Sequence, residues 1–144
     1  MAQVIHFPKT VGIAIYSMVF ISLFDARMNV DRIAEFTSSS KFHTAKILKE
    51  LAKYGYLKST RGPSGGFELN QLEEEISLLE LWEVVEGKFE IKVCLSGNKG
   101  CLEIGCIFSD EIYNIQNNLY DYLRNTTILS LTKKAVLKKN HDCK

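Results

Sequence analysis

Residues 29–69 read NVDRIAEFTSSSKFHTAKILKELAKYGYLKSTRGPSGGFEL. Asn29 can cap a short helix over residues 30–36, because an asparagine side chain accepts a hydrogen bond from the first backbone amides of a helix. The polar run 37–40 interrupts the apolar pattern, and a second helix is predicted from Ser40 to Tyr54. Its inward face consists of Thr44, Ile47, Leu48 and Leu51, at the spacing of one helical face. The pattern predicts two helices joined by a tight turn.

A two-stranded hairpin is predicted directly after this second helix. Gly55 ends the helix as a cap, and residues 56–60 form a short strand pattern. Glycine and proline crowd residues 61–66, so the chain turns tightly there and returns as a strand over residues 67–69. Two helices followed by such a hairpin form a winged helix-turn-helix. In that arrangement the second helix enters the DNA major groove, and the hairpin, or wing, reaches the flanking backbone or minor groove.

Further helices are predicted on both sides of this unit. Apolar residues fill nearly every position from Thr10 to Phe24, which predicts a largely buried first helix for the core and for dimer contact. Ser77 can cap a helix over residues 78–86 that Gly87 closes, and a last short helix is predicted around residues 129–137. A long helix from Ser109 or Asp110 to Arg124 is assigned to dimerisation, because its apolar stripe is more than the small domain could cover. This stripe comprises Ile112, Ile115, Leu119, Tyr122 and Leu123.

The predicted fold is therefore mostly α-helical with a small β-hairpin wing, as a winged helix-turn-helix plus a long dimerisation helix. We expect three segments along the chain. Residues 1–70 form the winged helix-turn-helix DNA-binding domain, residues 71–108 form a linker helix and a cysteine-containing sensor loop, and residues 109–144 form the dimerisation helix and a C-terminal tail.

Composition and charge narrow the class of protein. With 144 residues and 46% hydrophobic content, the chain can bury a real core. The apolar stretch 11–24 is short and interrupted, and it lacks the features of a signal peptide, so we expect a cytoplasmic protein with no membrane partner. Between residues 41 and 61 there are six basic residues against the single acid Glu50, whereas acids crowd residues 73–90. The basic segment is suited to a polyanion.

The candidate DNA contacts lie in the second helix of the unit and at the tip of the wing. The N-terminal residues of a recognition helix reach base edges, where Lys41, His43 and Thr44 could donate to purine acceptors. Phe42 could contact a thymine methyl group or simply pack. Arg61 is suited to a narrow minor groove, where the negative potential is enhanced. The complete candidate set is Ser40, Lys41, Phe42, His43, Thr44, Lys46, Arg61, Gly62 and Ser64.

Three cysteines form a second candidate site. Cys94, Cys101 and Cys106 are spaced C-x6-C-x4-C in a loop that contains three glycines. Thiolates are the preferred ligands of iron-sulfur clusters and zinc, and the spacing lacks the CxxC pairs of an ordinary zinc ribbon. The alternative is that these cysteines are merely buried or redox-sensitive. Cys143 is interpreted as a free thiol in the tail, and no enzymatic motif is present, so we expect no enzyme.

These parts together resemble the Rrf2 family of bacterial transcription regulators over roughly residues 7–131. The resemblance rests on the wing RGPSGGFEL at residues 61–69, the segment EEISLLELWEVVEG at residues 74–87, and the three cysteines. It implies a homodimer on palindromic operator DNA, with a recognition helix that begins at Ser40 and with Arg61 in the minor groove. It also implies a [2Fe-2S] or [4Fe-4S] cluster on the three cysteines, whose loss, oxidation or nitrosylation changes DNA affinity and makes the regulator a redox, nitric oxide or iron sensor.

The chain departs from the family pattern at the fourth cluster ligand. Where some members place a histidine shortly after the third cysteine, this chain has the residues Ile107, Phe108 and Ser109, and Gly12 aligns with an N-terminal acidic ligand of others. The fourth ligand stays open among an exogenous small molecule and the residues Asp110, Glu103, His6 of either subunit and Cys143. A glutamate that reads a base in some members falls on Ala45, so we expect a different operator sequence.

Two alternative hypotheses accompany the cluster-controlled regulator. In the first, the protein is a cluster-free regulator of the same fold that responds through thiol oxidation or a protein partner. In the second, it is a metal-binding or redox protein whose winged helix makes only protein contacts and binds no DNA. The basic recognition helix argues against the second alternative.

Overall fold

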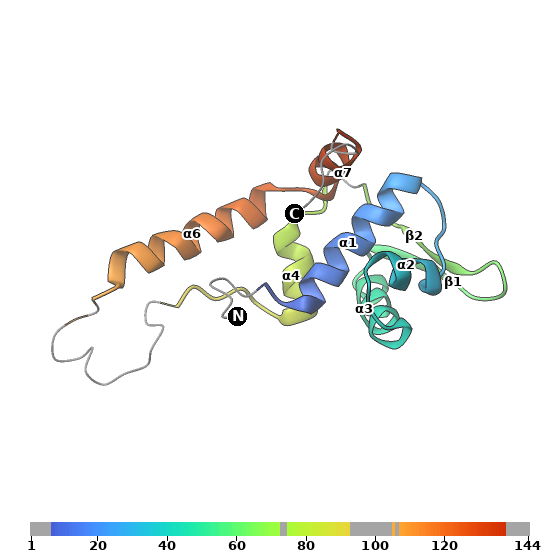
Figure 1. Cartoon of the computed structure of the whole chain (residues 1–144), viewed down its shortest axis with the longest axis horizontal. Coiled ribbons are helices and arrows are strands. Elements are labelled where there is room, and N and C mark those ends of the chain that lie inside the picture. The colour runs from blue at the N-terminus through green and yellow to red at the C-terminus, as the bar shows by residue number, and fades with distance from the viewer. Residues whose placement is uncertain (1–6, 73–74, 93–104, 106, 138–144) are drawn as a thin grey trace.

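The structure is a computed structural model that describes residues 7–72, 75–92, 105 and 107–137. Its elements are α1 (Lys9–Phe24), α2 (Val30–Phe36), α3 (Lys41–Lys53), β1 (Leu57–Thr60), β2 (Gly66–Leu69), α4 (Leu78–Glu86), α6 (Ser109–Asn125) and α7 (Ile128–Leu137). The predicted fold class, mostly α-helical with a winged helix-turn-helix and a long C-terminal helix, is confirmed (Figure 1). No described helix is long and apolar enough to cross a membrane.

Helix α1 is the centre of the molecule, as its nearly continuous apolar sequence predicts. Ten of its residues are buried, and α2, α3, α4, α7 and the wing strand β2 all pack against it. Because burial of one Ile or Leu side chain contributes about 1.5 to 3 kcal/mol, the packing around α1 supplies a large part of the folding free energy. Helix α1 therefore links the DNA-binding unit to the C-terminal helices.

The helix-turn-helix forms where the sequence predicts it, except that Ser40 caps its second helix and does not belong to it. The Asn29 side chain accepts a hydrogen bond from the Arg32 amide at 2.9 Å, and the Ser40 side chain accepts one from the His43 amide at 3.2 Å. Gly55, with a φ of 85°, follows the last turn of α3 in the left-handed conformation that favours glycine. The four predicted inward residues Thr44, Ile47, Leu48 and Leu51 are all buried.

The wing is an antiparallel hairpin that is also bonded to the loop before α2. Leu57 pairs with Leu69 at its base, and Thr60 pairs with Gly66 near its tip. An additional bridge joins Phe67 to Met28, so the start of β2 is held by backbone hydrogen bonds on both sides. The wing is therefore fixed to the body rather than attached through its ends alone.

The C-terminal helices close the other side of α1. Ser77 caps helix α4 as predicted, and the structure adds the reciprocal bond from Glu80 that completes a capping box. Leu123 of α6 is fully buried, and α7 is joined to α1 by the hydroxyl groups of Ser22 and Thr132, whose oxygens lie 2.9 Å apart in the core. In Figure 1 the first turns of α6 project away from the body. The buried cluster runs without interruption from α1 to α7, and the predicted segment boundaries at residues 70 and 108 stay predictions.

Candidate DNA interface and sensor segment

A chain of hydroxyl groups fixes the turn between α2 and α3. The Thr37 hydroxyl lies 2.8 Å from that of Ser39, which lies 2.9 Å from that of Thr44. Thr37 also donates to the Ile33 carbonyl at 3.0 Å. Because each hydroxyl has a partner, the polar run that ends α2 also holds the start of α3 in place. The sequence indicates only that this run interrupts the apolar pattern.

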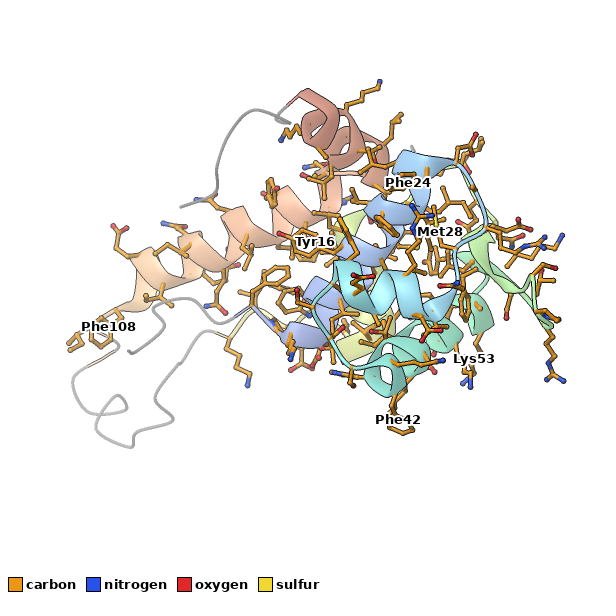
Figure 2. All side chains as sticks on the ribbon, turned by 45° about the vertical axis from the view of Figure 1, so that its right-hand side comes forward. Tyr16, Phe24, Met28, Phe42, Lys53 and Phe108 are labelled. Carbon is orange, nitrogen blue, oxygen red and sulfur yellow. The ribbon has the colours of Figure 1, made fainter. Side chains whose placement is uncertain are left out.

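The exposed start of α3 presents an aromatic and a basic side chain. Phe42 is 83% exposed and points away from the body (Figure 2), so it does not pack within the described chain. Lys41 is exposed as well, and its ammonium group pairs with the Asp31 carboxylate at 2.9 Å. Ser40, also exposed, uses its side chain to cap the helix, and His43 is half-buried beside Lys46 in a shallow pocket.

Thr44 is buried, whereas a contact to a DNA base requires an exposed side chain. Its side chain is fully buried and its hydroxyl group bonds to Ser39, so it has no surface for contacting DNA in this conformation. The helical spacing predicted an inward Thr44, and its position near the start of the helix suggested a base contact. The structure agrees with the inward position. We therefore assign Thr44 to the turn and leave it out of the DNA-contacting set.

The wing tip is fully open to a ligand. Arg61, Gly62 and Ser64 are all exposed. The turn is closed by a hydrogen bond from the Gly65 amide to the Gly62 carbonyl at 2.9 Å. A Cβ atom on Gly65 would lie 2.3 Å from the Thr60 carbonyl oxygen, so the tip needs glycine at this position. The tip therefore carries Arg61 on a tight turn.

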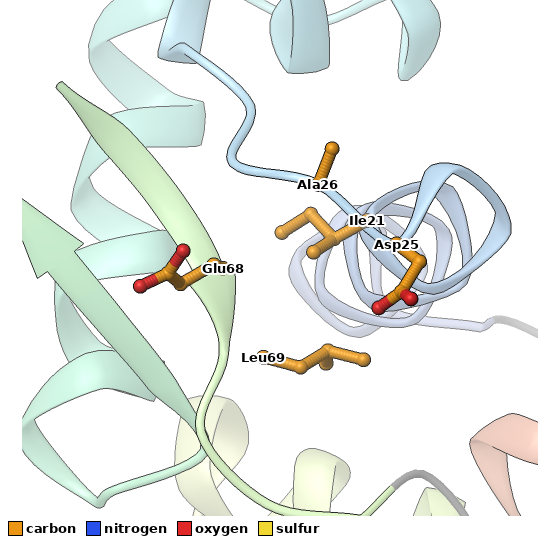
Figure 3. Close-up of a pocket in the computed structure, with 5 residues that line it drawn as sticks. All are labelled: Ile21, Asp25, Ala26, Glu68 and Leu69. Carbon is orange, nitrogen blue, oxygen red and sulfur yellow. The ribbon is translucent and has the colours of Figure 1, made fainter. Parts of the chain in front are cut away.

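A small pocket lies where the wing meets the body (Figure 3). It has a volume of about 130 Å³ and lies between the end of α1 and strand β2, with Asp25 and Glu68 on its walls. Glu68 is 3.5 Å from the Arg27 guanidinium and 3.9 Å from the Lys58 ammonium. Arg27 was not among the predicted DNA-contacting residues, because no pattern in the surrounding sequence indicates that it lies beside the wing. These pairs balance the Glu68 charge next to the candidate interface.

Other cations of this region have no carboxylate partner. Lys46, Lys49 and Arg61 form no ion pair with any residue that the structure describes, whereas Lys53 pairs with Glu50 at 3.8 Å. All three of these unpaired side chains are exposed. Unpaired cations on a helix and a neighbouring hairpin can neutralise phosphate groups and release counterions, which is the main source of affinity for DNA.

The loop after α3 is joined to α4 through Tyr56. Partial burial, and the nearby Glu80 carboxylate to which its hydroxyl group donates, raise the pKa of Tyr56 above its ordinary value. The Tyr56 carbonyl also accepts a hydrogen bond from the Asn70 amide at 3.1 Å, directly after the wing. Tyr56 thus connects the base of the wing to α4.

The predicted cysteine ligands Cys94, Cys101 and Cys106 lie outside the described residues, as do Cys143, Glu103 and His6. Within the described part of the chain no three His, Cys, Asp or Glu side chains are grouped to hold a metal ion. Asp110, the remaining candidate for a fourth ligand, is exposed in the first turn of α6. The residues on either side of this cysteine segment (residues 93–106), Lys92 before it and Ile107 after it, are described.

Lys92, directly before the cysteine segment, is hydrogen-bonded to α6. The Lys92 amide donates to the Gln116 side-chain oxygen at 2.9 Å, and the Gln116 side-chain nitrogen donates to the Lys92 carbonyl at 2.8 Å. Both bonds join residues 24 positions apart in the sequence. Because α6 begins only three residues after Cys106, the same helix anchors the chain on both sides of the cysteine segment.

The fold and the site define a winged helix-turn-helix protein of the DNA-binding class. The model of the Rrf2 family, described as an iron-dependent transcriptional regulator, matches residues 7–134. The chain therefore belongs to the Rrf2 family of transcription regulators, as its sequence motifs indicated.

Similar proteins carry regulator names. An HTH-type transcriptional regulator of Aquifex aeolicus is 27% identical over 129 residues, which cover 87% of this chain and 90% of that protein. The regulator NsrR of Bacillus subtilis is 37% identical over 71 residues, which cover 49% of each chain. These relatives agree with the absence of catalytic motifs from the sequence.

Solved structures of similar fold include two regulators. CymR of B. subtilis, described as the global cysteine regulator, has a TM-score of 0.73 and 17% identity, with 90% of this chain and 98% of that chain covered. IscR of T. potens has a TM-score of 0.71 and 19% identity, with 96% and 94% covered. At such identities the likeness concerns the fold.

Proposed function

We propose that the chain is a bacterial transcription regulator that binds palindromic operator DNA as a homodimer, under the control of an iron-sulfur cluster. The observation that carries the DNA-binding part is the exposed surface of α3 and the wing. It combines the uncovered ring of Phe42 with the unpaired cations Lys46, Lys49 and Arg61. Such a protein acts in the cytoplasm, where the bacterial chromosome lies.

In this proposal α3 lies in the major groove and the wing lies beside it. Lys46 and Lys49 contact phosphate groups, while Phe42 and His43 are close enough to the helix start to meet base edges. Arg61 extends from the wing tip into the minor groove. The proposed DNA-contacting residues are Ser40, Lys41, Phe42, His43, Lys46, Lys49, Arg61, Gly62 and Ser64.

The homodimer is supported by uncovered apolar side chains on α6. Ile115 and Tyr122 are about half exposed, although neighbouring positions on the same helix are buried against the body. A second copy of the helix would remove this surface from water, and a dimer related by a two-fold axis matches the symmetry of a palindromic operator.

The cluster is supported by the chemistry of its donors and by the family description. Three thiolates from Cys94, Cys101 and Cys106 suit a [2Fe-2S] or [4Fe-4S] cluster, and the matched family is iron-dependent. When bound, such a cluster would be oxidised by oxygen, nitrosylated by nitric oxide or lost when iron is scarce. The contribution of the chain is to hold Lys92 on Gln116, so that a change in the cysteine segment acts directly on α6.

Anaerobic purification, followed by an absorption spectrum and iron and sulfide analysis, tests the cluster. Absorbance between roughly 320 and 460 nm with near-stoichiometric iron and sulfide is expected of a thiolate-bound cluster. A colourless, iron-free protein after reconstitution would contradict cluster binding and favour the cluster-free regulator that uses thiol oxidation or a protein partner. A protein that binds no duplex in any redox state would favour the metal or redox protein without DNA binding.

A further inference from the structure

Three exposed apolar side chains form a straight stripe along α6. Phe108, which precedes its first residue, is 60% exposed, Ile115 is 53% exposed and Tyr122 is 49% exposed. They are seven residues apart, and this spacing places side chains on one face of a helix. Leu119 packs against the core, so the stripe lies beside the surface that α6 uses within its own subunit.

An apolar groove lies at the C-terminal end of this stripe. It has a volume of about 400 Å³ and is formed by α1, α6 and α7, with Tyr122 on one wall. The other walls include Gly12, Ile15, Tyr16, Leu131 and Ala135. Its walls are mainly apolar, and none of the described residues that line it carries a charge, so it suits a hydrocarbon or aromatic group. Figure 2 shows Tyr16 on the body and Phe108 at the far end of α6.

The stripe is symmetric about its middle residue. Phe108 and Tyr122 each lie seven positions from Ile115, and at about 1.5 Å per residue the two lie roughly 21 Å apart along the axis. If two copies of α6 pair antiparallel with the two-fold axis at Ile115, position 108 of one copy faces position 122 of the other. The exposed aromatic ring then reaches the apolar groove.

We propose that Phe108 of each subunit inserts into the groove between α1, α6 and α7 of the other subunit. The inference rests on the proposed homodimer and assigns its register and its main anchor. An aromatic ring in a desolvated pocket is the kind of contact that dominates interface energies. Each groove is incomplete alone, because nothing in the described chain of the same subunit covers Tyr16, which is 62% exposed.

This contact gives a route between subunits. Phe108 follows Cys106 by two residues, and the groove that would receive it is walled by α1, which packs against α3. A change in the cysteine segment of one subunit therefore acts on the recognition helix of its partner.

A photoreactive side chain at position 108 tests the insertion directly. The variant Phe108→p-benzoylphenylalanine is prepared in both ordinary and ¹⁵N-labelled form, the two are mixed, and cross-linked peptides are mapped by mass spectrometry. We expect cross-links between labelled and unlabelled chains that join position 108 to residues 12–19 or 131–135. The matched control is the same probe at Tyr113, which is 44% exposed and lies off the stripe; it is expected to give no cross-link to those residues.

Cross-links from position 108 that map elsewhere, or only within one chain, would overturn the proposal. If the larger probe prevents dimer formation, the reciprocal probe Ala135→p-benzoylphenylalanine must give cross-links to residues 107–109 of the other chain, and their absence would count against it equally. Sedimentation and duplex binding of the wild-type protein distinguish a failure of the Phe108 contact from a failure of the proposed function. A stable DNA-binding dimer with other cross-links removes only this register, whereas a monomer that binds no DNA removes the proposed function.

Discussion

Met28 and Phe67 exchange two backbone hydrogen bonds. The Phe67 amide donates to the Met28 carbonyl at 2.8 Å, and the Met28 amide donates to the Phe67 carbonyl at 2.9 Å. The pair holds the wing against the loop that leads into α2, and so fixes the position of Arg61 relative to α3. The adjacent Gly66 allows the two backbones to approach each other, because a Cβ atom there would lie 2.3 Å from the Met28 carbonyl oxygen.

Gly66→Ala should therefore release the wing. The steric conflict is with backbone atoms, and the φ of 154° at Gly66 adds strain for any other residue. We expect a loss of roughly 1 to 3 kcal/mol in the free energy of unfolding, measured by urea denaturation, together with weaker duplex binding. Gly87→Ala is the matched control, because its φ of 87° is also positive, no atom lies within 4 Å, and Gly87 is outside the proposed DNA-contacting set. Equal losses in both variants would contradict the steric argument.

Arg61→Ala should weaken operator binding without unfolding the protein. Arg61 is exposed and makes no ion pair with the described residues, so its removal leaves the fold unchanged. Loss of a specific groove contact costs roughly 1 to 3 kcal/mol of binding free energy. Fluorescence anisotropy with a labelled duplex measures it, and Lys133→Ala, on the distant helix α7, serves as the control. Unchanged affinity of Arg61→Ala would refute the assigned role.

Lys49→Ala should act differently from Arg61→Ala, because a phosphate contact carries no sequence information. We expect affinity to fall for all duplexes alike, and the slope of log K against log salt to decrease by about 1. The measurement is a salt titration on a specific and a random duplex. A loss confined to the specific duplex would instead place Lys49 at a base edge.

Gln116→Ala should free the chain that enters the cysteine segment. The variant removes the side-chain partner of both Lys92 backbone groups, so local opening becomes easier while the global fold is retained. We expect faster proteolysis within residues 93–106 and faster loss of visible absorbance in air. Asn117→Ala is the control, since among the described residues that side chain bonds only to the carbonyl of Tyr113 in its own helix. Identical behaviour of the two variants would show that the Lys92 contact does not control the segment.

Cys101→Ala should abolish cluster loading and leave a folded dimer. Loss of one of three thiolates leaves too few protein ligands for a stable cluster. The fold should be retained, because the hydrophobic core around α1 is built from other residues. Iron analysis, the visible spectrum and sedimentation of the reconstituted variant measure both parts, with the wild-type protein reconstituted in parallel as the control. Full visible absorbance in Cys101→Ala would remove it from the ligand set.

The parts of the fold that local chemistry determines could be predicted from the sequence. Asn29 and Ser77 each cap the helix that follows, as expected, because a capping side chain bonds to amides only three residues away. Ser40 was predicted as the first residue of its helix and instead caps α3 in the same way. The glycine-rich wing follows from turn geometry in the same way. The long helix α6 was also predicted, but its apolar stripe was treated as one surface. In the structure it divides between Leu123, buried in the core, and Ile115, exposed.

Contacts between distant residues could not be predicted. Met28 and Phe67 are bonded through their backbones, so their side-chain types carry no signal, and nothing in the sequence indicates that Gln116 holds Lys92. Thr44 shows the limit within one helix. Its spacing indicated an inward position while its place in the recognition helix suggested a base contact, and only the Ser39 bond and its burial decide between them.

Selection of bound sequences from a random duplex library tests whether the protein binds an inverted repeat under the control of a cluster. The protein is used anaerobically with its cluster and again after the cluster is removed, at one fixed salt concentration. We expect enrichment of an inverted repeat bound by two chains, with an affinity that differs at least about tenfold, or roughly 1.4 kcal/mol, between the two forms. Failure to enrich any sequence in either form would contradict it, and an enriched repeat bound equally by both forms would contradict control by the cluster.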